Sequence, residues 1–239
     1  MAIPCYLAMT AAEYAACSVL PSHIGWMACH FSLQNNGLSN LPQQLPANAL
    51  LILDDSIPME NHSIDAIVSQ LTDAAQEFQI DAVLLDFQRL GLAQEKELAA
   101  GLGAALPCPV AAPAEYAVGT MPIFLPPVPL NKPIRPYISQ HSGRELWLDA
   151  APTPIRFRIT SDYSICESLS SIDRALPLAD TQAHCHYEIQ LSDTCATFTL
   201  GRSKEDFSQW LQDAEALGIT RVVGLYQELT DYDNEKAAL

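Results

Sequence analysis

The chain has 239 residues, 49% of them hydrophobic, which is enough for one well-buried core. Its formal net charge of −16, from 12 basic and 28 acidic residues, would repel nucleic-acid phosphates and anionic lipid head groups. We therefore expect neither a nucleic-acid nor a membrane partner, and no stretch approaches the roughly 18 consecutive apolar residues of a spanning helix.

Short apolar runs alternate with segments of helical period, a pattern typical of βα units around a parallel sheet. Thr10 and Glu13 form a capping box that starts a first helix. Residues 63–78 carry one apolar stripe at helical spacing, and 97–106 predicts a helix weakened by two glycines. Before residue 155 the sequence predicts seven barrel strands, at 5–9, 23–31, 49–55, 81–87, 109–113, 121–127 and 144–150.

In the last third of the chain, the spacing of the hydrophobic residues first changes to every second position. From 155 to 200 apolar and polar residues alternate, which predicts antiparallel, half-solvated strands. Ser203 then caps a helix that Gly218 stops, and 220–229 predicts an eighth barrel strand. The Pro-rich segment 126–144 shows no convincing helix.

These elements predict an α/β fold in one domain spanning 1–239. It is a modified (β/α)8 TIM barrel with missing or shortened helices and an antiparallel β insertion, 155–200, between strands seven and eight. Barrel enzymes place their chemistry at the C-terminal ends of the strands. In this chain those ends carry His30, Asp54, Asp55, Asp86, Gln88, Glu115, Asp149, Tyr226 and Glu228. Acidic residues there also cap helix N-termini, an alternative to catalysis for each of them.

Three segments resemble glycoside hydrolase family 18, the chitinase-like barrels. The family signature D-x-x-D-x-D-x-E ends its fourth strand, and "DAVLLDFQ" stands at the fourth predicted strand here, with Asp81 first, Leu84 second, Asp86 third and Gln88 last. The inserted region after strand seven and the ending "SKEDFSQWLQDAEALGITRVVGLYQELTDYD" are also similar, with Tyr226 in place of the usual Trp. "HIGWMACHF" and "ALLILDD" are similar to the second and third strands of the family.

The resemblance implies a sugar site that has lost its acid. In the family the terminal Glu is the general acid, while the preceding Asp orients the substrate's N-acetyl group, which attacks the anomeric carbon. Gln88 stands in place of that Glu, and an amide cannot deliver a proton at neutral pH. Asp86 could still orient a sugar amide. The family's Tyr-Asp pair near strand six has no counterpart in "MPIFLPPVPL".

Three functions follow as hypotheses. The first is a non-catalytic or catalytically impaired barrel that binds a carbohydrate or related polar ligand at the strand-end mouth; its ligand-binding candidates are Asp86, Gln88, Asp149, Tyr226, His30 and Asp54. The second is a glycoside hydrolase with another carboxylate as acid; its catalytic candidates are Asp86, Asp55, Glu115 and Glu228. The third is an interaction module whose insertion strands pair with a partner or a second copy by their edges.

Other chemistries find little support in the sequence. His184 and His186 share a strand face, but a metal needs a third ligand and Glu188 is the one local option, so we expect no metal site. Nucleotide-binding loops, a serine-hydrolase elbow and H-E-x-x-H are absent, and we expect no cofactor. Seven cysteines without a C-x-x-C pair, and Glu13 within the first apolar run, indicate a reduced, cytoplasmic chain without a signal peptide. The sequence leaves oligomer formation open.

Overall fold

The barrel predicted from the sequence is confirmed. The computed structural model describes residues 3–34, 36–59, 62–89, 91–141, 143–230 and 232. Eight parallel strands lie in the order β1-β14-β8-β7-β6-β5-β4-β2, and β1 pairs with β2 to close the barrel. The strands are β1 (Cys5–Met9), β2 (Ile24–Phe31), β4 (Leu50–Asp54), β5 (Ala82–Asp86), β6 (Val110–Pro113), β7 (Ile123–Leu125), β8 (Leu146–Asp149) and β14 (Ile219–Leu225).

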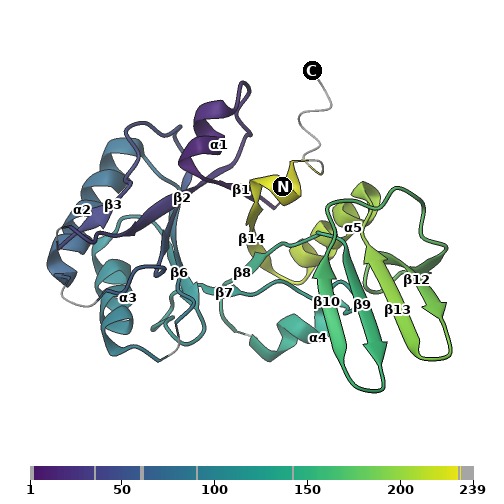
Figure 1. Ribbon diagram of the computed structural model, residues 1–239. Coiled ribbons are helices and arrows are strands. Elements are labelled where there is room, and N and C mark those ends of the chain that lie inside the picture. The colour runs from purple at the N-terminus through teal and green to yellow at the C-terminus, as the bar shows by residue number, and fades with distance from the viewer. Residues whose placement is uncertain are drawn as a thin grey trace.

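The helical layer is incomplete, as predicted (Figure 1). The Pro-rich segment 126–144, where no helix was predicted, nevertheless contains a five-residue helix, Ile134–Ile138, since its Pro136 lies in the first turn, where backbone N–H groups have no helical partner. In the described part of the chain, helices of more than ten residues lie after β4, after β5 and before β14. The helix predicted at 97–106 starts earlier, at Ala93, because Ala93 to Lys96 are themselves good helix formers. The helices are α1 (Ala11–Ala16), α2 (Ile64–Phe78), α3 (Ala93–Ala105), α4 (Ile134–Ile138), α5 (Lys204–Ala216) and α6 (Tyr226–Leu229), with a 3₁₀ turn at Ser139–His141.

An antiparallel sheet is inserted between β8 and β14, where the period-two segment predicted it. Its hairpins extend away from the barrel in Figure 1. The strand order is β10-β9-β13-β12-β11, with β9 (Ile155–Thr160), β10 (Ser164–Ser168), β11 (Leu178–Asp180), β12 (Cys185–Leu191) and β13 (Cys195–Gly201). A further short strand, β3 (Leu38–Ser39), pairs antiparallel with β2 in the Asn- and Gln-rich loop, where the sequence predicted no strand.

The continuous hydrophobicity of the barrel strands reflects burial on both faces. Alternate residues point inward and fill the barrel, among them Tyr6, Ile52, Leu84, Trp147 and Val223. The residues between them point outward, where α2 and α3 cover one side and α5 covers another. This alternation also aims Asp86 into the barrel, because it lies two residues beyond Leu84 on β5.

Asp81, the first position of the resembling motif, lies at the N-terminal end of the barrel, before β5. Its carboxylate accepts a hydrogen bond of 2.5 Å from the Tyr6 hydroxyl and bonds of 3.0 and 2.9 Å from Nε and Nη2 of Arg221. The Arg221 guanidinium lies 4.7 Å from the ring centroid of Trp147. These contacts join β1, β8 and β14 to the start of β5, which is a structural role at the end opposite the strand-end mouth. In the part of the chain that the structure describes, no helix has both the length and the apolar character needed to cross a membrane.

Candidate functional site

The C-terminal ends of the barrel strands surround a cavity of about 570 Å³. We call it the mouth cavity. Its floor is apolar and consists of inward-facing side chains such as Ile52, Leu84 and Phe124. Its polar lining comes from the strand ends and from the segment after β7. The polar lining residues are Asp86, Gln88, Glu115, Tyr137, Gln140, His141 and Asp149.

Asp86 and Gln88 lie side by side after the fourth barrel strand. The Gln88 side-chain amide donates a hydrogen bond from Nε2 to Oδ1 of Asp86 at 2.5 Å. Burial raises the pKa of Asp86, the charges of Asp54 and Asp55 raise it further, and the Gln88 hydrogen bond lowers it. Gln88 itself is exposed to solvent. The pair therefore presents one carboxylate and one amide, held together, to the mouth cavity.

Asp55 is buried, and its carboxylate is used in hydrogen bonds to the backbone. Its side chain is 2% exposed, and its two carboxylate oxygens accept the backbone N–H groups of Gln88 and Arg89, each at 2.9 Å. This arrangement fixes the chain that leaves β5 and sets the position of Gln88. Asp55 was one of the predicted acids, and its observed contacts are those of a residue that positions a loop. Its neighbour Asp54 accepts the backbone N–H of Ser56 at 2.8 Å.

Asp149 ends the seventh barrel strand and lines the mouth cavity with Asp86. Its pKa is raised from 3.8 to about 7, mainly by burial and also by the negative charges of Asp86 and Glu228, while the hydrogen bond from the Ala150 backbone N–H lowers it. Asp149 therefore holds a proton over part of the neutral pH range. A carboxyl group with this pKa can donate or accept a proton near pH 7, which the Gln88 amide cannot.

Of the other predicted site residues, some line the mouth cavity and others do not. Glu115 lines the mouth cavity but is exposed. The His30 ring lies 2.9 Å from the Phe31 carbonyl and 3.0 Å from the Asn40 side chain, beside β3. Tyr226 begins α6, packs partly buried against the core outside the barrel wall, and places its hydroxyl 3.7 Å from Cys17 Sγ. Neither His30 nor Tyr226 is among the residues that line the mouth cavity.

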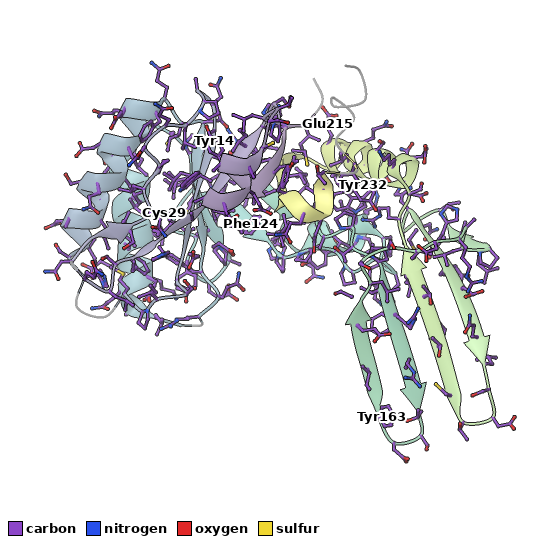
Figure 2. All side chains as sticks on the ribbon, turned by 45° about the horizontal axis from the view of Figure 1, so that its top comes forward. Tyr14, Cys29, Phe124, Tyr163, Glu215 and Tyr232 are labelled. Atoms are coloured by element: carbon purple, nitrogen blue, oxygen red, sulfur yellow. The ribbon has the colours of Figure 1, made fainter. Side chains whose placement is uncertain are left out.

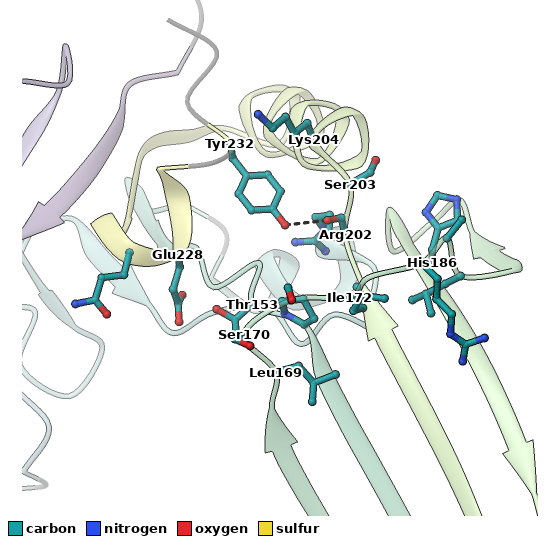
Figure 3. Close-up of a pocket in the computed structure, with 17 residues that line it drawn as sticks. Thr153, Leu169, Ser170, Ile172, His186, Arg202, Ser203, Lys204, Glu228 and Tyr232 are labelled. Atoms are coloured by element: carbon teal, nitrogen blue, oxygen red, sulfur yellow. Dashed lines mark hydrogen bonds between the residues drawn. The ribbon is translucent and has the colours of Figure 1, made fainter. Parts of the chain in front are cut away.

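Glu228 lines a second cavity, of about 810 Å³, between α6 and the insertion. Figure 3 shows Glu228 near Thr153 and Ser170, with Tyr232 and Arg202 farther toward α5. The Tyr232 hydroxyl donates to the Arg202 carbonyl at 2.8 Å, and the Arg202 side chain donates to the carbonyls of residues 183 and 184. The negative charge of Glu228 also contributes to the raised pKa of Asp149 in the mouth cavity.

The His184 and His186 side chains are used in structural contacts with α5. His184 lies 2.8 Å from Asp213 and His186 lies 2.9 Å from Asp206, near opposite ends of that helix. Within the ranges that the structure describes, no three His, Cys, Asp or Glu side chains gather as a metal-binding group would.

Some residues of the mouth cavity were missed by sequence reasoning. Tyr137, Gln140 and His141 come from the Pro-rich segment after β7, to which no function was given. The Tyr137 hydroxyl donates to the Pro126 carbonyl at 3.0 Å, and burial and the charge of Asp149 raise its pKa. Met27 is a second omission. It lies on β2 with its side chain toward the barrel interior, and inward alternation along that strand was the one available signal.

Comparison by sequence finds no relative: no family model matches the chain, and no curated protein matches it. Comparison by structure does. A glycoside hydrolase family 18 N-acetylglucosaminidase from Paenibacillus barengoltzii superposes with a TM-score of 0.63 at 11% identity, covering 98% of this chain and 99% of that one. A chitinase from Chromobacterium violaceum gives 0.60 at 12% identity, covering 98% and 99%. The spore cortex-lytic enzyme SleL of Bacillus cereus gives 0.59 at 9% identity, covering 95% and 73%.

These likenesses extend over nearly the whole chain, insertion included. At such low identity they establish shared architecture and leave the chemistry of each site to be argued from its own residues. The chain therefore has the fold of the chitinase-type glycoside hydrolase barrels, as the resemblance in its fourth strand and its insertion implied.

Proposed function

We propose that the mouth cavity binds a saccharide or a related polar ligand, with Asp86, Gln88 and Asp149 as the polar contacts. The observation that carries this proposal is the 2.5 Å hydrogen bond from Gln88 to Asp86 at the edge of the cavity. It leaves an amide where the resembling family has its acid, and keeps Asp86 oriented. The ligand is recognised at this position without being protonated from it.

The lining of the cavity suits a sugar. Saccharides present hydroxyl groups around a ring whose faces are apolar, and they bind where carboxylates and amides surround an apolar or aromatic floor. Asp86, Asp149 and Gln88 supply acceptors and one amide donor, while Phe124 and Leu84 supply the floor. The net charge of −16 favours a neutral ligand over an anionic one.

The proposal is tested by titration calorimetry with a panel of neutral oligosaccharides, with and without N-acetyl groups. We expect saturable binding of at least one class, and a loss of affinity of about tenfold or more in Asp86→Ala, the size of one hydrogen bond to a charged group. Asp73→Ala, on the exposed face of α2, is the matched control and should bind normally. Absence of binding across the panel, or equal affinity in Asp86→Ala, would refute the assignment.

A second candidate is hydrolysis with Asp149 as the acid, favoured by its pKa of about 7 in the cavity that it shares with Asp86. In this reaction Asp149 gives its proton to the glycosidic oxygen as the C–O bond breaks. Water forms the new bond to the anomeric carbon and gives its proton to Asp86. The two carboxyls are then returned to their starting protonation by solvent.

Hydrolysis is tested with fluorogenic aryl glycosides. The rate should fall as the pH rises above about 7, as Asp149 loses its proton, and should vanish in Asp149→Asn. A chain that binds saccharides but hydrolyses none of the substrates supports the binding function alone.

A further inference from the structure

The inserted sheet has two faces of opposite character. Residues that face each other across an antiparallel pair point to the same side, so the register assigns every side chain to a face. Phe157 of β9 pairs with Phe198 of β13, which pairs with Ile189 of β12. We call this side the apolar face. Its members are Ile155, Phe157, Ile159, Cys166, Leu178, Asp180, Cys185, Tyr187, Ile189, Leu191, Ala196, Phe198 and Leu200, with Ser164 and Ser168 at one edge.

The opposite side is polar and is partly covered by the chain itself. Arg156 and Glu167 form an ion pair across β9 and β10, and Arg174 forms another with Glu188 of β12. The connection between β10 and β11 supplies Arg174 and also places Ile172 against Gly201, over the base of this side. The polar face therefore already has a covering segment and a network of charges.

Among the residues that the structure describes, the chain covers the apolar face at its base alone. Leu200 and Cys185 are buried there, next to the barrel. Toward the hairpin tips the side chains become exposed: Ile189 is 42% exposed, Ile159 45% and Leu191 78%. Figure 2 shows the hairpins projecting clear of the barrel, with Tyr163 at one tip. Between base and tips lies a hollow of about 420 Å³, lined by Phe157, Phe198 and their neighbours and by Asn131 of the barrel.

A single sheet with one apolar side leaves that side in water unless a second layer covers it. We propose that the second layer is the same face of a second copy of this chain, so that the protein forms a homodimer by packing sheet on sheet. This inference is independent of ligand binding at the mouth cavity.

The distribution of charge makes the apolar face the most favourable surface for a contact between two copies. Each chain has a formal charge of −16, so two copies repel each other over most of their surface. On the apolar face Asp180 is the one carboxylate, and neither Lys nor Arg is present. Two copies therefore meet with the least repulsion here. A strongly charged partner would find almost nothing to pair with.

The strand order also suits a symmetrical contact. β13 is the central strand, with β9 and β10 on one side and β12 and β11 on the other. A two-fold axis in the interface, perpendicular to β13, places each strand over its own counterpart and the two acidic barrels at opposite ends of the sandwich. Phe198 then lies near the centre of the interface, and Phe157 meets Phe157 of the second copy. This is an isologous interface in the aligned sheet packing of β-sandwiches.

The size of the face fits a dimer of moderate affinity. Five strands about 4.8 Å apart, the longest with seven residues of about 3.3 Å each, give a face of at most roughly 24 by 23 Å. Two such faces bury at most about 1,000 Å² in total, the lower end of specific interfaces and far below obligate ones. We therefore expect monomer and dimer to exchange with concentration.

Sedimentation velocity and light scattering over a wide concentration range test the proposal. The wild type should move from 26.1 kDa toward twice that mass as concentration rises. Ile189→Asp should remain monomeric, since an unpaired carboxylate would be buried in the interface. The next residue gives the matched control: Gln190→Asp introduces the same charge on the polar face and should dimerise as the wild type does.

Both substituted residues are exposed in the single chain, so neither change buries a charge in the monomer, and circular dichroism melts should confirm that both variants fold. A wild type that stays monomeric at all concentrations would overturn the proposal. So would a dimer that survives Ile189→Asp, because such a dimer would use an edge or another surface. Dissociation of both variants would also contradict it, because the effect of the added charge would then not depend on which face of the sheet carries it.

Discussion

The side-chain amide of Gln88 donates a 2.5 Å hydrogen bond to the Asp86 carboxylate at the edge of the mouth cavity. The backbone at Gln88 is itself fixed, because the buried Asp55 carboxylate accepts its N–H at 2.9 Å. A carboxylate that receives an amide hydrogen bond is oriented as a ligand-binding group. Position 88 is therefore the place at which the proposed binding function can be tested separately from catalysis.

Gln88→Glu should create a proton donor at that place. Two neighbouring carboxyls share a proton near neutral pH, since both cannot easily be charged. If the resembling mechanism is otherwise intact, hydrolysis of N-acetylated aryl glycosides should rise by about 10²- to 10⁴-fold over the wild type, the range for general acid catalysis. Initial rates with a fluorogenic substrate measure it.

Gln88→Asn is the control, because it keeps an amide and should give no gain. A Gln88→Glu variant that retains saccharide affinity but gains no activity would show that more than the acid is missing. The lack of a Tyr-Asp pair in strand six is the first place to look for the difference.

Asp149→Asn should change how stability depends on pH. The pKa of Asp149 is about 7 in the folded chain and 3.8 ordinarily, so between these values the folded state holds the extra proton. Folding stability then falls as the pH rises through this window and levels off above about 7. Asp86, whose pKa is also raised, contributes in the same direction.

The measurement is urea unfolding at about pH 5 and about pH 8. One pKa unit corresponds to about 1.4 kcal/mol, and with partial solvent screening we expect the wild type to lose about 1 to 3 kcal/mol more than Asp149→Asn between the two conditions. Equal losses in the two proteins would mean that Asp149 is not protonated in the folded state at neutral pH.

Asp55→Ala should destabilise the fold, since it leaves the backbone N–H groups of Gln88 and Arg89 without their acceptor. We expect a cost of about 2 to 4 kcal/mol in the free energy of unfolding. Asp73→Ala, exposed on α2, should cost less than about 0.5 kcal/mol. A stable Asp55→Ala chain with altered chemistry in place of altered stability would restore Asp55 as a candidate acid.

Asp81→Asn tests the contacts at the opposite end of the barrel. Arg221 would lose a charged partner that it holds through two nitrogens, while Tyr6 would lose its acceptor charge. We expect a loss of about 1 to 3 kcal/mol on thermal or urea unfolding, with saccharide binding at the mouth unchanged. The exposed pair of Arg156 and Glu167 provides the comparison, and Glu167→Gln should cost about 0 to 1 kcal/mol. A smaller effect at Asp81 than at Glu167 would contradict the structural role.

Sequence reasoning succeeded where local periodicity determines structure. The continuous apolar runs at 49–55 and 81–87 are strands buried on both faces, and the alternation around Tyr187 and Ile189 is a half-exposed antiparallel strand. The capping boxes at Thr10 and Ser203 start helices as predicted. In each case the signal lies within a few neighbouring residues.

It fell short where long-range contacts decide the role of a residue. Asp54 and Asp55 look alike in sequence, yet Asp55 binds the backbone after β5, thirty-three residues away. Tyr137 reaches the mouth from a segment without periodicity. The predicted last strand, 220–229, ends at Leu225, and Tyr226 packs against the core outside the barrel wall because the chain turns into α6 there. The turn into α6 and these long-range contacts cannot be predicted from the pattern of neighbouring residues.

Methyl NMR on methionine tests the central claim most directly, because Met27 lines the mouth cavity and Met59 is buried outside the barrel wall. During titration with the best saccharide ligand, the Met27 methyl resonance should shift and saturate at the affinity measured by calorimetry, while the Met59 resonance stays in place. Met27→Leu assigns the signal. A saturating ligand that leaves Met27 unmoved would show that the mouth of the barrel is not the binding site.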